Sequence, residues 1–155
     1  MAIIIREAQT NERDELIPLL LQAEPSESAL RWSLDNLSDT IYRMDEDDKL
    51  VGAATMRWRK APVEIIELAI AGNHHGQGLG RQMIDYLIAE ARHRGKAQLF
   101  VGTANSGIGN IVFYQKCGFR MDSVRKDYFW YHASPVFENG IRTRDLLVFR
   151  YDLAE

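Results

Sequence analysis

The sequence is poor in the features that mark secreted and membrane proteins. It holds one cysteine, Cys117, among 155 residues, so no internal disulfide can form and a reducing compartment is indicated. Its apolar start, Met1–Ile5, meets Arg6 and Glu7 at once and is too short for a signal peptide or a membrane span. We therefore expect a cytoplasmic protein that engages no membrane.

An excess of positive charge is also missing. Lysines and arginines number 19 against 22 acidic residues and are spread along the chain, which leaves a net charge of −3. A nucleic-acid-binding face needs clustered basic residues, so we expect no nucleic-acid partner. Internal repeats and Pro/Gly/Ser-rich linkers are lacking too, which predicts one domain spanning residues 1–155. The sequence does not choose between a monomer and a homodimer.

Hydrophobic periodicity and turn residues predict strands and helices that alternate in the middle of the chain, with hairpins toward its ends. We expect strands over Ile3–Arg6, Thr40–Met44, Leu50–Trp58, Val63–Ala71, Gln98–Thr103, Phe119–Arg125 and Leu146–Tyr151. We expect helices over Asn11–Ala23, from Ser26 onward, from the glycines at Gly76–Gly80 to about Arg94, and up to Lys116 with Asn105 or Ser106 as the cap. The acidic run Asp45–Asp48 is expected to be a solvated turn, and Pro135–Asp145 receives no assignment. The pattern predicts an α/β protein with a mixed sheet covered by helices.

A glycine-rich loop joins the apolar strand ending near Ile70 to the next helix. Glycines in Gly76–Gly80 allow a tight turn that brings backbone N–H groups together at a helix N-terminus, which suits a pyrophosphate. A Walker loop is excluded because no Gly-Lys-Ser/Thr follows, and a dinucleotide fingerprint fits poorly because Arg81 stands where a small residue is needed.

Two segments together resemble a known family. The stretch from Leu68 to Gly80 resembles motif A of the GNAT N-acetyltransferases, and Phe113–Phe119 resembles their Tyr-x-x-x-Gly-Phe motif B. The resemblance implies a central, twisted, mostly antiparallel mixed sheet flanked by about four helices. It also implies direct transfer of an acetyl group from acetyl-CoA to a primary amine of a small molecule, peptide or protein, in a ternary complex.

The resemblance further implies which residues hold acetyl-CoA. They are Leu68, Ala69, Ile70, His75, Gly76, Gln77, Gly78, Leu79, Gly80, Arg81, Asn105 and Tyr114. His75 departs from the family's usual Gln or Arg, which bears on the affinity for the cofactor, and the usual spacing would put the polar residue assigned to Asn105 at Gly107. His74 and His75 lack a third ligand at a familiar spacing, so we expect no metal.

Acetyl transfer to an amine requires a base, and two glutamates are candidates. Glu64 and Glu67 lie in an otherwise apolar strand, where burial would raise a carboxyl pKa toward a useful value. Glu64 has the spacing that histone-type family members use, and Glu67 faces the other side of the strand unless a bulge intervenes. Water or another residue stays an alternative. Some relatives place a glutamate on the following strand, where this chain has Gly102.

Tyr114 is the residue that, by the resemblance, protonates the leaving thiolate. The acceptor pocket has less defined candidates: Trp58, Tyr128, Trp130 and Tyr131 either line it or serve ordinary packing. Two other functions stay open from the sequence. One is a non-catalytic acyl-CoA sensor, which His75 and Gly102 favour and Tyr114 opposes, and the other is a nucleotide-binding module.

Overall fold

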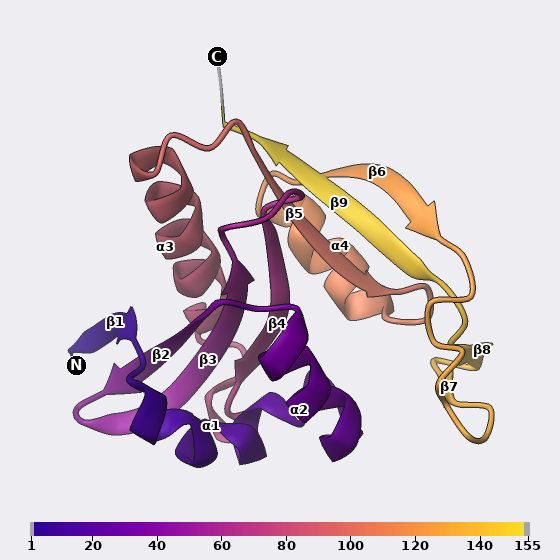
Figure 1. The fold of residues 1–155 in the computed structure, drawn as a ribbon, viewed down its shortest axis with the longest axis horizontal. Helices are drawn as coiled ribbons and strands as arrows, with labels where there is room; N and C mark the ends of the chain where they lie inside the picture. Colours follow the sequence, from indigo (N-terminus) through magenta and orange to yellow (C-terminus); the bar gives the residue numbers. More distant parts are fainter. Residues whose placement is uncertain (1, 154–155) are drawn as a thin grey trace.

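The computed structural model describes residues 2–153 (Figure 1). The long strands are β1 (Ile3–Glu7), β2 (Thr40–Glu46), β3 (Lys49–Arg57), β4 (Glu64–Ile70), β5 (Gln98–Ala104), β6 (Arg120–Arg125) and β9 (Leu146–Asp152). Two short strands, β7 (Phe137–Glu138) and β8 (Ile141–Arg142), form a separate hairpin. The helices are α1 (Arg13–Leu20), α2 (Glu27–Asn36), α3 (Leu79–His93) and α4 (Ile108–Lys116), with 3₁₀ turns at Thr10–Glu12 and Gly72–His74.

The seven long strands form one sheet in the order β1-β2-β3-β4-β5-β9-β6. All neighbours are antiparallel except β4 and β5, which confirms the mixed, mostly antiparallel sheet that the sequence predicted. Helix α3 forms the crossover that this parallel pair requires, so the loop before α3 leaves from the end of β4. None of the helices described within residues 2–153 is long and apolar enough to cross a bilayer.

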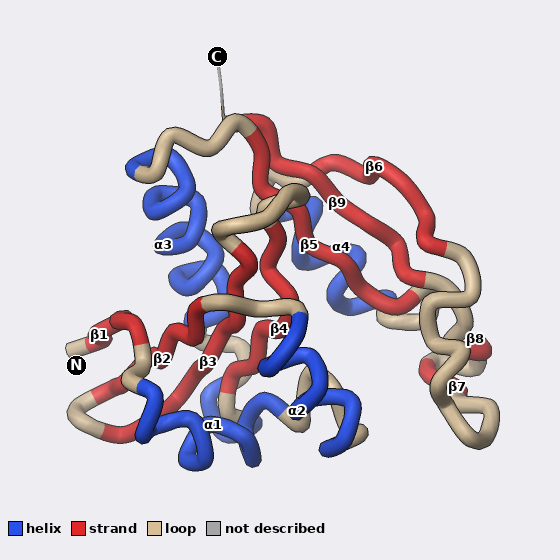
Figure 2. The backbone as a smooth tube through the Cα atoms, viewed as in Figure 1, coloured by secondary structure: helices blue, strands red, loops and turns tan. Residues whose placement is uncertain are grey.

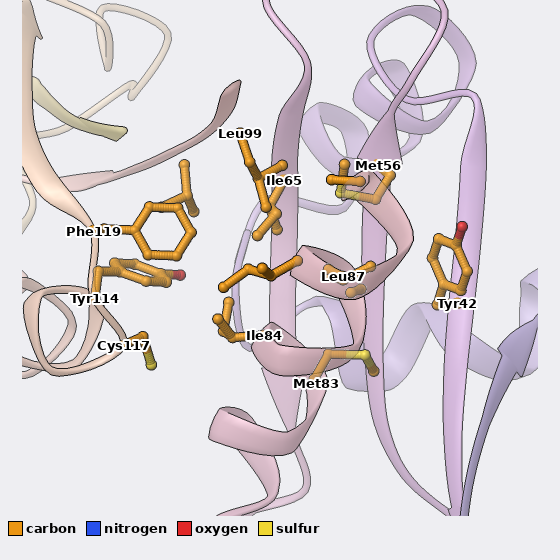
Figure 3. Packing of buried hydrophobic residues seen from close by; sticks show 14 of the residues in the cluster. Tyr42, Met56, Ile65, Met83, Ile84, Leu87, Leu99, Tyr114, Cys117 and Phe119 are labelled. Carbon is orange, nitrogen blue, oxygen red and sulfur yellow. The ribbon is translucent and has the colours of Figure 1, made fainter. Parts of the chain in front are cut away.

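Helices cover both faces of the sheet (Figure 2). Helix α3 buries its predicted apolar stripe against strand residues that include Met56 and Ile65, as Figure 3 shows. That stripe consists of Leu79, Met83, Ile84, Leu87, Ile88 and Ala91. Helices α1 and α2 pack their leucines against Ala53 and Ala69 in a second cluster. Because Ala53 and its neighbour Ala54 belong to different clusters, the two helical layers lie on opposite faces.

Two predicted boundaries near the N-terminus were only partly right. The expected helix over Asn11–Ala23 is split into a 3₁₀ turn and α1, which ends at Leu20. The acidic run is not wholly a turn, because Asp45 lies in β2 and binds Arg43 through two short contacts of 2.9 and 2.7 Å. The turn itself is made by Asp47 and Asp48, both with positive φ.

The two helix caps predicted from the local sequence had different outcomes. Ser26 caps α2 as predicted, since its Oγ accepts the Ala29 N–H at 3.2 Å. The prediction for α4 was wrong: Gly107 is the cap, because Asn105 and Ser106 direct their side chains to the segment around β7 and β8. That hairpin falls in Pro135–Asp145, the stretch that received no assignment.

Candidate active site

The parallel strands β4 and β5 part soon after they meet. They pair at Glu64 with Phe100 and at Ile65 with Val101, and no further pair joins them among the described residues. Strand β4 continues to Ile70 with β3 on its other edge, and β5 continues beside β9. The backbone of β4 beyond Ile65 is therefore an open strand edge, which can hydrogen-bond an extended ligand as another strand would.

The open edge runs into the glycine loop. Gly76 and Gly78 adopt φ of +80° and +77°, and Gly78 is the N-cap of α3. The N–H groups of the first helical turn have no intrahelical partner, and the helix dipole makes this end attractive to an anion. A Cβ on Gly76 or Gly78 would meet no atom within 4 Å, so the space over these glycines is clear for a ligand. The loop thus fits a pyrophosphate.

Other residues of the loop have structural contacts. The Nε2 of His75 lies 2.7 Å from the Ile70 carbonyl oxygen, which can only accept, so the imidazole donates there and directs Nδ1 elsewhere. Arg81 donates to the Lys116 carbonyl at 3.0 Å and ties the start of α3 to the end of α4. Gly80 allows close packing, because a Cβ there would lie 3.2 Å from the Phe113 ring.

Tyr114 lies in α4 within an aromatic cluster. Its ring packs against Phe113, Phe119 and Phe149 at centroid distances of 5.3 to 5.9 Å. In Figure 3 the hydroxyl points toward the side of α3 that carries Ile84. It makes no hydrogen bond to residues 2–153, and it is not among the fully enclosed polar atoms without a partner, so its oxygen keeps a small contact with solvent. Burial raises the pKa of Tyr114 above its usual range, and the Cys117 thiol adds to the shift. The phenol therefore stays protonated and free to donate.

A β-bulge brings the two candidate glutamates to one face. Thr55 pairs with Glu67 and the next residue, Met56, pairs with Ile65, so Ile66 is the extra residue of β4. Glu67 therefore does not face the opposite side from Glu64, as it would in an unbroken alternation. Both carboxyl groups lie on the face covered by α1 and α2, away from Tyr114.

The two carboxyl groups differ in their partners. Glu64 is 4% exposed and accepts from Arg57 at 3.0 Å and from Arg125 at 3.0 and 3.4 Å, so its oxygens are held by two guanidinium groups. Glu67 is 7% exposed and accepts from the hydroxyls of Ser33, at 2.7 Å, and Thr55, with no ion pair among the described residues. Burial raises the pKa of Glu67 against the opposing effect of these hydrogen bonds.

The model of the acetyltransferase (GNAT) family matches residues 6–119, about three quarters of the chain. The chain belongs to the GNAT acetyltransferase family.

Individual relatives agree with this assignment. A Bacillus subtilis (strain 168) protein, the uncharacterized N-acetyltransferase YvbK, is 34% identical over 142 residues that cover 90% of each chain. A GNAT family acetyltransferase from Elizabethkingia anophelis, solved with acetyl-CoA bound, has a TM-score of 0.86 at 29% identity and covers 97% of this chain and 98% of its own. A Bacillus subtilis acetyltransferase in complex with CoA has a TM-score of 0.86 at 32% identity, with coverages of 98% and 99%. The GNAT fold predicted from two motifs is confirmed.

Several predicted GNAT residues have other contacts in this chain. Asn105 donates to the Arg142 carbonyl and accepts from the N–H groups of Arg144 and Asp145, so its amide anchors the segment before β9, and its cofactor role stays a prediction. Gly102 is tightly packed, because a Cβ there would lie 2.6 Å from a side-chain carbon of Leu146, so any side chain at this position requires Leu146 to shift.

The aromatic candidates for the acceptor pocket differ in their exposure to solvent. Trp58 is 2% exposed and donates to the Tyr42 hydroxyl at 3.1 Å, so it belongs to the core, whereas Trp130 is 83% exposed. Tyr131 donates to Glu24 in the connection between α1 and α2. No group of three His, Cys, Asp or Glu side chains within residues 2–153 is arranged to hold a metal ion.

Sequence reasoning missed Ser33, Thr55 and Glu24, which surround Glu67. Ser33 belongs to a helix and Thr55 to a neighbouring strand, 34 and 12 residues from Glu67. A single hydroxyl in an apolar stretch of helix or strand is a weak signal, and the register that pairs Thr55 with Glu67 depends on the bulge.

Proposed function

We propose that this chain uses acetyl-CoA to N-acetylate a primary amine, by direct transfer in a ternary complex held within one domain. One observation carries the proposal: the open edge of β4 runs straight into the glycine loop at the N-terminus of α3. A single ligand can therefore hydrogen-bond the edge of β4 through an extended arm and bind the glycine loop through its phosphates. The relatives solved with acetyl-CoA or CoA support the same ligand.

In this proposal the N–H groups of Gln77–Gly80 bind the pyrophosphate and the Leu68–Ile70 backbone binds the pantetheine arm. His75 is already engaged at the Ile70 carbonyl, so it contributes to the cofactor site chiefly by shaping this end of the strand. Acetyl-CoA supplies the acetyl group activated as a thioester. Everything else in the reaction is positioning and proton transfer by the chain's own residues.

We assign the base to Glu67 and not to Glu64. Protonating Glu64 would break its charge-assisted hydrogen bonds to two arginines, which favour the carboxylate. Glu67 has neutral hydroxyl donors and a raised pKa, so it is a better proton acceptor at neutral pH. A lysine-like amine is about a thousandfold protonated near pH 7, which costs roughly 4 kcal/mol, so such an acceptor gains most from this base.

The bonds and protons balance with one acid and one base. An acceptor that arrives as an ammonium first gives one proton to the Glu67 carboxylate, which releases it to solvent. The neutral amine nitrogen then forms the new C–N bond and loses its second proton to Glu67, while the C–S bond of the thioester breaks. The departing sulfur takes a proton from the Tyr114 hydroxyl. Glu67 and Tyr114 lie on opposite faces of the sheet, so acceptor and cofactor would approach the opening between β4 and β5 from opposite sides.

Two measurements test the proposal. A panel of primary amines is assayed for thiol release from acetyl-CoA, and the melting temperature is followed with CoA, ATP and NAD, because a ligand that binds only the folded state stabilises it. We expect stabilisation by CoA alone and thiol release with at least one amine. Stabilisation by CoA without thiol release for any amine would favour a sensor, and stabilisation by ATP or NAD in place of CoA would contradict the cofactor.

A further inference from the structure

The exposed hydrophobic side chains of this chain gather at one end of the sheet. Ten large ones are exposed within residues 2–153, and seven of these lie in α4, β6 and the segment 136–141. Strand β6 is the edge strand opposite β1, and Figure 1 shows α4 and the β7–β8 hairpin on the half of the sheet that holds β6. Single exposed hydrophobic residues are ordinary, whereas a group of them marks an interaction site.

Helix α4 has an uncharged outer stripe over most of its length. Ile108 and Val112 are four residues apart, so they share one face of the helix, and they are 43% and 45% exposed. The helix has no charged residue before Lys116, its last, whereas α1, α2 and α3 each carry at least three. A helix that faces water normally carries charged residues on its exposed side. The stripe is therefore suited to burial against another protein.

The side chains of β6 continue this surface. Met121 pairs with Phe149 and Val124 pairs with Leu147. Paired residues point to the same face of a sheet, and Phe149 packs against Tyr114 of α4, so the exposed Met121 and Val124 point to the α4 side. A β-bulge follows Met121 and interrupts the free edge of β6. A partner is therefore expected to pack on this face instead of adding a strand to the edge.

Opposite charges lie at the two ends of the α4 stripe. Lys116 continues the stripe one turn after Val112, at the C-terminal end of the helix. Glu138 lies at the N-terminal end, where it accepts a hydrogen bond from Ser106 at 3.2 Å, next to the N-cap Gly107. Neither Lys116 nor Glu138 forms an ion pair with any residue of the range 2–153. Both charges are therefore available to a partner.

We propose that this chain forms a homodimer in which the α4 faces of two copies pack antiparallel about a two-fold axis near Val112. Ile108 and Lys116 are each four residues from Val112, about 6 Å along the helix. Antiparallel packing therefore brings Lys116 of each copy to the N-terminal end of the other α4, where Glu138 lies. Every contact is made twice, as a two-fold interface requires. Matching charges at the two ends of one helix favour a second copy over an unrelated partner.

The proposed interface extends beyond the helix. A standard interface takes about 20–30 residues from each partner, more than a helix of nine residues can supply. The interface therefore includes β6 and the β7–β8 hairpin, where Ile141 pairs with Glu138 and is exposed on the same side. Its centre is apolar and its charges lie at the ends, which is the usual division between the core and the rim of an interface.

The oligomeric state tests the proposal. Sedimentation equilibrium over a range of concentrations is measured for wild type, Val112→Glu and Trp32→Glu, and thermal unfolding shows that each variant is folded. Val112→Glu puts a charge at the centre of the proposed interface, whereas Trp32→Glu makes the same kind of change at an exposed side chain of α2. We expect wild type and Trp32→Glu at twice the monomer mass, and Val112→Glu at the monomer mass.

Exchanging the two end charges tests the antiparallel arrangement. Lys116→Glu and Glu138→Lys each set like charges against one another twice in the dimer, which should raise its dissociation constant by about tenfold. The double variant again places opposite charges together and should regain most of the wild-type affinity. A structural effect of either substitution alone would persist in the double variant.

Three outcomes would overturn the inference. One is a wild type that stays monomeric at every concentration, which would leave the face to a different partner. The second is a folded Val112→Glu variant that still dimerises, and the third is a double charge variant that binds no more tightly than the single ones. None of these measurements involves acetyl transfer, so the dimer can fail while the proposed function holds, and the reverse.

Discussion

Removing one hydroxyl from each of two buried tyrosines should separate catalysis from stability. Tyr114→Phe takes away the proton that we assign to the departing sulfur. Because this proton is used only as the C–S bond breaks, kcat and kcat/KM should fall together by about 10²–10⁴-fold, with acetyl-CoA affinity nearly unchanged.

The structure predicts little effect of Tyr114→Phe on folding. The Tyr114 hydroxyl makes no hydrogen bond to residues 2–153, and its ring contacts with Phe119 and Phe149 are kept by phenylalanine. No donor or acceptor is left without a partner, so the melting temperature should stay within a few degrees of wild type.

Tyr42→Phe is the matched control. The Tyr42 hydroxyl accepts from Trp58 Nε1 at 3.1 Å, and both side chains are at most 2% exposed. Its loss leaves a buried indole N–H without an acceptor, which costs about 1–3 kcal/mol and should lower the melting temperature by about 2–12 °C. Turnover below that temperature should be retained.

The assay is steady-state thiol release with an amine accepted in the panel, together with thermal unfolding of each variant. The reasoning would be refuted if Tyr114→Phe kept wild-type turnover with chemistry rate-limiting, or if it lost stability as Tyr42→Phe does. A loss confined to weaker cofactor binding would make Tyr114 a packing residue.

Three further changes test other parts of the site and the fold. Gly78→Asp should weaken CoA binding strongly in calorimetric titration, because it adds a negative charge beside the pyrophosphate and a side chain at positive φ. Gly78→Ala adds the side chain without the charge and so measures the effect of backbone strain alone. If the Asp variant bound CoA with wild-type affinity, the loop would not be part of the cofactor site. Glu67→Gln should lower turnover, and this defect should shrink as the pH rises because the amine then deprotonates without a base. Ser33→Ala removes a hydrogen-bond donor that lowers the pKa of Glu67, so the acidic limb of the pH–rate profile should move to higher pH. An acidic limb at the wild-type pH would contradict the assignment of Glu67 as the base. Arg43→Met should cost about 3–5 kcal/mol in urea unfolding, because buried Arg43 binds three carboxylates: Asp45 would be left without a cation, Glu12 would keep only Arg6, and Glu15 would rely on solvent. A neutral result would mean that water replaces Arg43 at these carboxylates without cost.

The strands and helices of this fold were largely predictable because hydrophobic periodicity and glycine turns are local signals. The α3 stripe and the Ser26 cap are examples. The cap of α4 was not predictable in the same way, since Asn105 and Ser106 are drawn to partners in the segment around β7 and β8, more than thirty residues away.

The cofactor loop of the candidate site was also visible in the sequence, whereas the ranking of the two glutamates was not. Glu64 differs from Glu67 because Arg125, 61 residues later, pairs with it, and because an extra residue at Ile66 turns both carboxyl groups to one face. Long-range pairing and strand register are tertiary properties that no local pattern carries.

The short contact between β4 and β5 also has a mechanical consequence. These strands share two residue pairs, whereas β3 and β4 share six and β5 and β9 share seven. A force that pulls β1 and β6 apart should therefore separate β4 from β5 first, because this strand pair has the fewest hydrogen bonds. A ligand that lies along the free edge of β4 and contacts α4 would strengthen this connection between β4 and β5. Its binding should raise the rupture force when the two attachment points lie on opposite sides of the β4–β5 pair. The rupture force should not change when both points lie on the same side.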